Sequence, residues 1–159
     1  MNHLKIILLA ISSFTAGVLT ARHAATKRIY EEWKGREKNI SLYHLTNEWL
    51  AMKQKNMDFA KYFKDRGYCS IAIYGMGYLG ERLVDELNHT GIGISYAIDR
   101  GKKGGYAGVA IKDLDGELPA VDAVVVTPIY DFWEIKRNLA GVLECPVISL
   151  EDIIFKSAG

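Results

Sequence analysis

Three glycines at a fixed spacing are the residues of this chain best suited to binding chemistry. Gly75, Gly77 and Gly80 form the pattern G-x-G-x-x-G directly after the short apolar run 71–74. At a turn from strand to helix, the first glycine permits the tight turn, the second lets the backbone approach a phosphate, and the third lets helix and strand pack closely. The free N–H groups and the positive end of the helix would then hold an anion. The candidate site is the whole loop: Gly75, Met76, Gly77, Tyr78, Leu79 and Gly80.

A carboxylate follows about 20 residues after the glycines, at the spacing typical of a dinucleotide site. The run 92–98 reads as a second strand that ends in Asp99. A carboxylate in that place accepts hydrogen bonds from ribose hydroxyls. Arg100 then opens a basic, glycine-rich loop. Beside a nucleotide this loop would meet a second phosphate, and otherwise it is a solvated surface loop.

Alternating strands and helices must position these residues. Leu79, Leu83 and Leu87 lie on one face of a helix that begins in the glycine loop. Further strands are predicted at 109–111, 121–126 and 146–148, with a helix from Asp131. This alternation predicts an α/β fold with a parallel sheet, and right-handed crossovers give the order 3-2-1-4-5.

The order reverses between strands 1 and 4, and ligands of such sheets bind at the carboxyl ends of the strands at that point. The loop after strand 4 contains Thr127 and Tyr130. Topology alone therefore adds both residues to the candidate site, while capping and packing are their alternative roles.

The segments IAIYGMGYLG, YAIDR and AVVVTPIYDF give the chain a resemblance to the Rossmann NAD(P)-binding family, over roughly the C-terminal 90 residues. They are also similar to small Rossmann-like modules of bacterial nucleotide-sugar and surface-polysaccharide systems. The resemblance implies NAD, NADP or a nucleotide-sugar as the ligand, and a glycosyltransferase or a second copy of the chain as partner. The catalytic residues of the epimerases have no match here.

We expect an accessory or sensing module rather than an enzyme that acts alone. No histidine, tyrosine–lysine or carboxylate pair stands where a hydride-transfer acid or base is expected, and no second domain follows. The alternative is an NAD(P)-dependent oxidoreductase or epimerase that a partner chain completes. A third possibility is a scaffold that has kept the fold and lost the ligand.

The N-terminus predicts a membrane anchor. No charged residue occurs in the run 6–21, and the anchor would comprise residues 4–21. A cleaved signal peptide and a buried helix are the alternatives. Basic residues crowd the C-terminal flank, which predicts that the body of the protein faces the cytoplasm. The expected domains are an anchor at 1–22, a helical linker at 23–67 and a nucleotide-binding domain at 68–159.

Composition excludes several other classes. The 159 residues include 20 basic and 19 acidic ones, so the net charge gives no drive toward nucleic acid. The two cysteines, Cys69 and Cys145, stand far apart and outside any metal-binding spacing. Neither a metal site nor a disulfide framework is expected.

Overall fold

The computed structural model describes residues 2–157 and the side chains of residues 17–157. The chain divides into two units, Met1–His44 and Leu45–Gly159. The predicted linker 23–67 is therefore shared between them. Helix α1 (Asn2–Gln54) makes up the first unit, and its last turns belong to the second.

The second unit contains a six-stranded, mostly parallel sheet with the order β3-β4-β2-β1-β5-β6. All pairs are parallel except β3 with β4. The predicted α/β fold is confirmed, and the predicted order 3-2-1-4-5 corresponds to β4-β2-β1-β5-β6. The strands are β1 (Ser70–Tyr74), β2 (Gly93–Ile98), β3 (Gly105–Tyr106), β4 (Val109–Lys112), β5 (Ala123–Val126) and β6 (Val147–Ser149).

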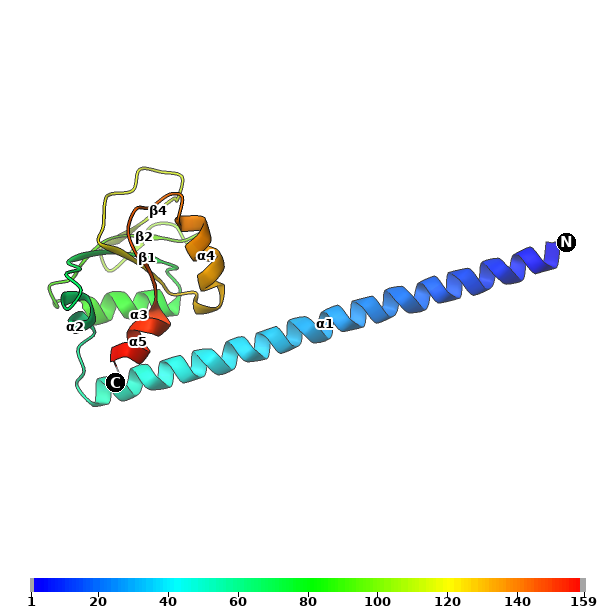
Figure 1. The fold of residues 1–159 in the computed structure, drawn as a ribbon, viewed down its shortest axis with the longest axis horizontal. Coiled ribbons are helices and arrows are strands. Elements are labelled where there is room, and N and C mark those ends of the chain that lie inside the picture. Colours follow the sequence, from blue (N-terminus) through cyan, green and yellow to red (C-terminus); the bar gives the residue numbers. More distant parts are fainter. Residues whose placement is uncertain (1, 158–159) are drawn as a thin grey trace. The chain divides into compact units, whose positions relative to one another are not determined.

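Short helices cover the two faces of the sheet (Figure 1). On one face α2 contacts both α3 and α5, and α4 packs on the other face. These helices, together with a 3-10 turn, are α2 (Phe59–Lys64), α3 (Tyr78–Leu87), η1 (Ile129–Asp131), α4 (Phe132–Leu139) and α5 (Leu150–Ser157).

Residues of the central strands alternate between the two faces. Ala72 and Tyr74 of β1 belong to the core cluster that includes Ile135 and Leu139 of α4. Ile71 and Ile73 alternate with them and are also fully buried. Burial on both faces explains the nearly continuous apolar sequence of β1 and β5.

The β3–β4 hairpin was not predicted from the sequence. Its two-residue turn consists of Ala107 and Gly108, both with positive φ, at 48° and 86°. Such turns favour Asn-Gly or Asp-Gly, and an alanine with positive φ is unusual. The sequence therefore lacks the usual hairpin signal at this point.

The predicted membrane-spanning helix requires a correction. The helix itself is present, but no helix in the described part of the chain is long and apolar enough to cross a membrane. Residues 4–16, most of the predicted anchor, lie outside the described side chains. The uncharged run 6–21 would measure roughly 24 Å at 1.5 Å per residue, which is short of a hydrocarbon core of about 30 Å.

The last turns of α1 are part of the core of the second unit. Leu45, Trp49 and Met52 are buried there. The Trp49 ring packs on the Phe59 ring of α2, with 5.0 Å between their centroids. Asp58 caps α2 by accepting a hydrogen bond from Ala60 N at 2.8 Å.

This packing predicts that the end of α1 stabilises the globular unit. Met52→Ala leaves a cavity where a side chain is 1% exposed, and it should lower the free energy of unfolding by about 2–5 kcal/mol. The exposed neighbour Gln54 offers a control, since Gln54→Ala should change stability by no more than about 0.5 kcal/mol. Urea unfolding followed by circular dichroism measures both. Equal stability of the two variants would contradict this packing.

Candidate functional site

The register of the central strands brings three loops to one edge of the sheet. Tyr74 is paired with Ile98 on one side and with Val126 on the other. The next residues of the three strands, Gly75, Asp99 and Thr127, therefore leave the sheet side by side. Two of these residues were predicted from motif spacing and the third from topology.

The turn after β1 requires glycine at two positions. Gly75 has a φ of +94°, and a Cβ there would lie 2.6 Å from Cδ of Pro128. A Cβ on Gly80 would lie only 2.2 Å from the carbonyl oxygen of Gly75. Both glycines are buried, and both are explained by the fold of the chain itself.

Gly77 differs from its two neighbours in the motif. Its φ of −75° is open to any residue, and a Cβ there would have no heavy atom within 4 Å. It is the N-cap of α3 but offers no side chain to cap the helix. Gly77 and Tyr78 at the start of α3 are exposed, and the N-cap position lacks the Ser, Thr, Asp or Asn that usually accepts from the first N–H groups of a helix.

Asp99 holds the glycine turn in place. Its Oδ2 accepts a hydrogen bond from Met76 N at 2.6 Å, and its Oδ1 accepts bonds from Gly101 N and Lys102 N, both at 2.8 Å. Burial raises the pKa of this carboxyl, but the three N–H donors and the Lys102 ammonium outweigh it and hold the pKa below its ordinary value of 3.8. Contact with a ribose stays a prediction, because this carboxylate already has a structural role.

The loop after β2 makes a second contact with the helix. Lys102 forms an ion pair with Glu81 in the first turn of α3, with 2.5 Å between Nζ and Oε1. The hydrogen bond to Glu81 is the main reason why the pKa of Lys102 is raised. Residues 99–102 therefore join the second strand to both the glycine turn and the start of α3.

Thr127 secures the turn from the opposite side. Its hydroxyl is buried and donates to the carbonyl oxygen of Gly75 at 2.7 Å. Its backbone N donates to Tyr74 O at 3.0 Å. Thr127 is thus a positioning residue, and Tyr130 lies half-buried in η1 nearby in sequence.

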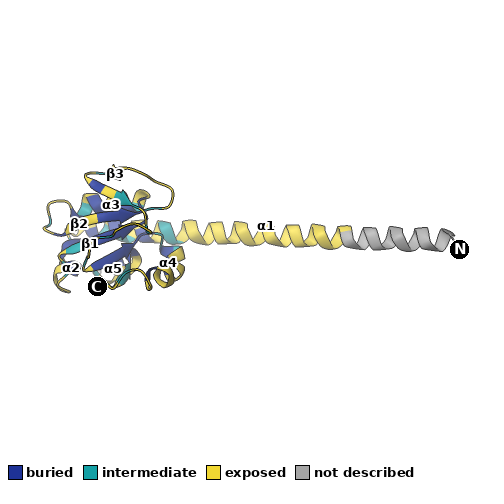
Figure 2. Cartoon of the chain, turned by 90° about the horizontal axis from the view of Figure 1, so that it is seen from above, coloured by how far each residue is buried: buried dark blue, intermediate teal, exposed yellow. Residues whose placement is uncertain are grey.

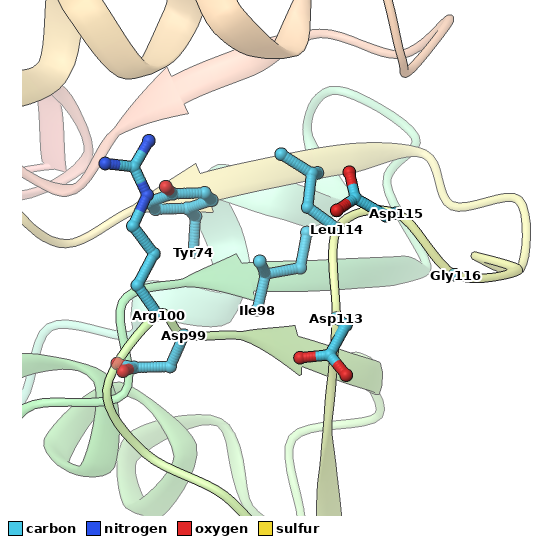
Figure 3. Close-up of a pocket in the computed structure, with 8 residues that line it drawn as sticks. All are labelled: Tyr74, Ile98, Asp99, Arg100, Asp113, Leu114, Asp115 and Gly116. Atoms are coloured by element: carbon cyan, nitrogen blue, oxygen red, sulfur yellow. The ribbon is translucent and has the colours of Figure 1, made fainter.

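Two adjoining cavities open at the carboxyl ends of the strands. The larger, of about 590 Å³, lies between the ends of β2 and β4 and includes Ile98 and Asp113 (Figure 3). The second, of about 350 Å³, includes Gly75, Pro128 and Glu134. Both share three lining residues: Tyr74, Asp99 and Arg100.

The lining of these cavities is acidic. Arg100 is the one cation among the lining residues, and Figure 3 shows its side chain beside Tyr74. Carboxylates accept hydrogen bonds from hydroxyl groups, so this surface suits a hydroxyl-rich group better than a chain of phosphates. The carboxylates belong to Asp99, Asp113, Asp115, Asp131 and Glu134.

The sequence alone did not indicate Tyr74, Asp113 or Glu134 as site residues. Asp113 directly follows β4 and so lies at the same edge of the sheet as Asp99. The predicted strand order could have indicated Asp113 as a site residue. Two predicted loop residues point elsewhere. Met76 is fully buried, and Leu79 lines a separate cavity with Trp49. Tyr78 is 89% exposed at the first position of α3.

Comparisons of the chain with protein-family models, with curated proteins and with solved structures found no match.

Asp99→Asn should destabilise the protein at neutral pH. Asparagine has one acceptor oxygen, so its amide group must face an N–H donor, and an unsatisfied buried donor costs about 1–3 kcal/mol. The difference in free energy of unfolding between the wild type and Asp99→Asn should be fully present above pH 3.8. It should shrink as the pH falls through the lower pKa of folded Asp99. Urea unfolding of both proteins between pH 7 and pH 2.5 measures this difference.

Two controls isolate the effect of Asp99. Backbone N–H groups of Ser70 and Cys69 lower the pKa of Asp122, but Asp122 titrates equally in both proteins and cancels from the difference. Asp115→Asn changes an exposed carboxylate and should leave stability within about 0.5 kcal/mol of wild type. A wild-type advantage that does not depend on pH would contradict this role of Asp99.

Gly80→Ala should also destabilise the protein, against the usual trend for helices. Alanine normally stabilises a helix by roughly 0.5–1 kcal/mol relative to glycine. Here the new Cβ would meet the Gly75 carbonyl at 2.2 Å, so overpacking should cost about 1–3 kcal/mol. Thermal unfolding measures the sign of the change, and a stabilised variant would show that helix and turn do not pack this closely.

Proposed function

We propose that residues 68–159 form a Rossmann-like domain that binds a nucleotide or a nucleotide-sugar, as a binding module rather than as an enzyme acting alone. The phosphate would lie at the N-terminus of α3, over Gly77. The strand order supports this proposal, because the glycine turn lies at the point where the order reverses from β2 to β5 around β1.

Gly77 is the observation that carries the proposal. Gly75 and Gly80 are glycines because a side chain would clash inside the protein, but at Gly77 a side chain would meet open space. A capping residue at this N-cap position would stabilise α3 better than glycine does. An external group that needs close access to the N–H groups of α3 accounts for the glycine.

The surrounding charges favour a ligand with two chemically different ends. The start of α3 offers N–H groups and the positive end of the helix dipole, which suit a phosphate. The adjoining cavities offer carboxylates, which suit the hydroxyls of a ribose or another sugar. Arg100 lines both cavities and would contact a second phosphate between these ends.

Gly77→Asp tests the phosphate position. A carboxylate about 4 Å from a phosphate would raise the binding free energy by about 4 kcal/mol at an effective dielectric constant of 20, which is roughly a thousandfold in dissociation constant. The free energy of unfolding of the unliganded protein should change by no more than about 0.5 kcal/mol. The stabilisation from a capping carboxylate is opposed by its repulsion from Glu81, four residues further along.

The measurement is a thermal shift with NAD⁺, NADP⁺, UDP-glucose and pyrophosphate as separate probes. A ligand at about 100 times its dissociation constant stabilises the native state by about 2.7 kcal/mol, or roughly 5–10 °C for a chain of this size. Gly77→Asp should abolish the shift. Gly141 is an equally open, exposed glycine, and Gly141→Asp should retain it. If no probe shifts the wild-type midpoint, the glycine loop is a structural turn only.

A further inference from the structure

The large exposed hydrophobics of α1, within residues 17–54, lie on one stripe. Residues 17–40 are all exposed (Figure 2). If Leu19 is position a of a heptad, six large exposed hydrophobics occupy a and d positions, and the other two, Val18 and Tyr30, occupy the adjacent g and e positions. The six are Leu19, Ile29, Trp33, Ile40, Tyr43 and Leu50.

This stripe is not the face that packs within the chain. The α1 residues buried in the globular unit are Leu45, Trp49 and Met52. They occupy c and f positions of the same heptad and lie on the opposite side of the helix from a and d. Every large hydrophobic exposed on the described part of α1 therefore belongs to a second, separate face.

We infer that this stripe is a dimer interface, and that a second copy of the chain pairs with it as a parallel, in-register coiled coil. Large hydrophobics fill six of the ten a and d positions between residues 19 and 50, and a 3.5-residue repeat is the pattern of two helices wound around each other. The second copy provides the same spacing by symmetry. A helix this long takes most of its stability from packing of an apolar face rather than from helix propensity.

Two of the four polar residues at a and d positions, Arg36 and Asn47, fit this partner and this orientation. The four are Arg22, Thr26, Arg36 and Asn47. In a parallel, in-register pair each d residue packs beside d and e of the other helix, which places Arg36 next to both Arg36 and Glu37 of the second copy. The Glu37 carboxylate then offsets the repulsion between the two guanidinium groups. Asn47, at an a position, then faces Asn47 of the second copy. A buried Asn pair of this kind specifies register and the two-stranded state at some cost in stability.

Cysteine cross-linking of the full chain tests the orientation. In a background with Cys69→Ser and Cys145→Ala, Ile29→Cys and Ile40→Cys should each form a disulfide-linked dimer on mild oxidation. These sites are 11 residues, or about 16 Å, apart along the helix. An antiparallel pair would therefore link at one of them at most. Glu31→Cys, on the outer f position, should remain uncrosslinked.

Molar mass tests whether the stripe itself holds the dimer. Light scattering of the full chain, in a nonionic detergent that keeps the apolar run 6–21 dispersed, should give twice the chain mass of 17.8 kDa. Ile29→Lys with Ile40→Lys should reduce the mass to one chain without changing the melting of the globular unit. The matched outer-face pair, Ala24→Lys with Glu31→Lys, should remain dimeric.

Three outcomes would overturn the inference: a monomeric wild type, a dimer that survives the two stripe lysines, or cross-linking at Glu31→Cys as strong as at Ile40→Cys.

Discussion

The glycine turn after β1 is held from both sides, and the rest of the site depends on this constraint. Asp99 accepts the N–H of Met76, and the Thr127 hydroxyl donates to the carbonyl oxygen of Gly75. Both partners come from strands adjacent to β1, so the turn is fixed only when β2, β1 and β5 are in register. The conformation of the turn therefore depends on the register of the sheet.

Under this constraint the three glycines have different roles. Two of them satisfy the fold, since Gly75 needs its positive φ beside Pro128 and Gly80 needs contact with the Gly75 carbonyl. The turn thereby sets the direction in which α3 begins, with Gly77 exposed at its start. A backbone held this firmly would need little reorganisation to receive an anion, which favours binding because less order must be imposed on association.

Much of this arrangement could be predicted from the sequence because the patterns are local. Apolar runs predicted every strand of the sheet except β3, and the right-handed crossover rule predicted the order of those five. The partners of individual side chains could not be predicted. Motif spacing placed Asp99 at the end of the second strand, but it did not indicate that its oxygens accept the N–H groups of Met76, Gly101 and Lys102. Sequence spacing places a residue at a strand end, while hydrogen-bond partners depend on loop conformation. The apolar run 6–21 is a second case in which a local pattern was insufficient, since the membrane span was predicted from hydropathy alone.

The electrostatics of the edge bear on which ligand the proposed site would prefer. Free phosphate could occupy the start of α3, but the carboxylates of Asp113, Asp115 and Glu134 in the adjoining cavities would repel any further negative charge. Hydroxyl groups would instead donate to those carboxylates. A molecule that joins a phosphate to a sugar satisfies both parts of the surface at once. A polyphosphate satisfies only the first, because the lining supplies Arg100 as its single cation. Selectivity for sugar-bearing phosphates would then arise from repulsion of the competing ligands as much as from attraction of the preferred one.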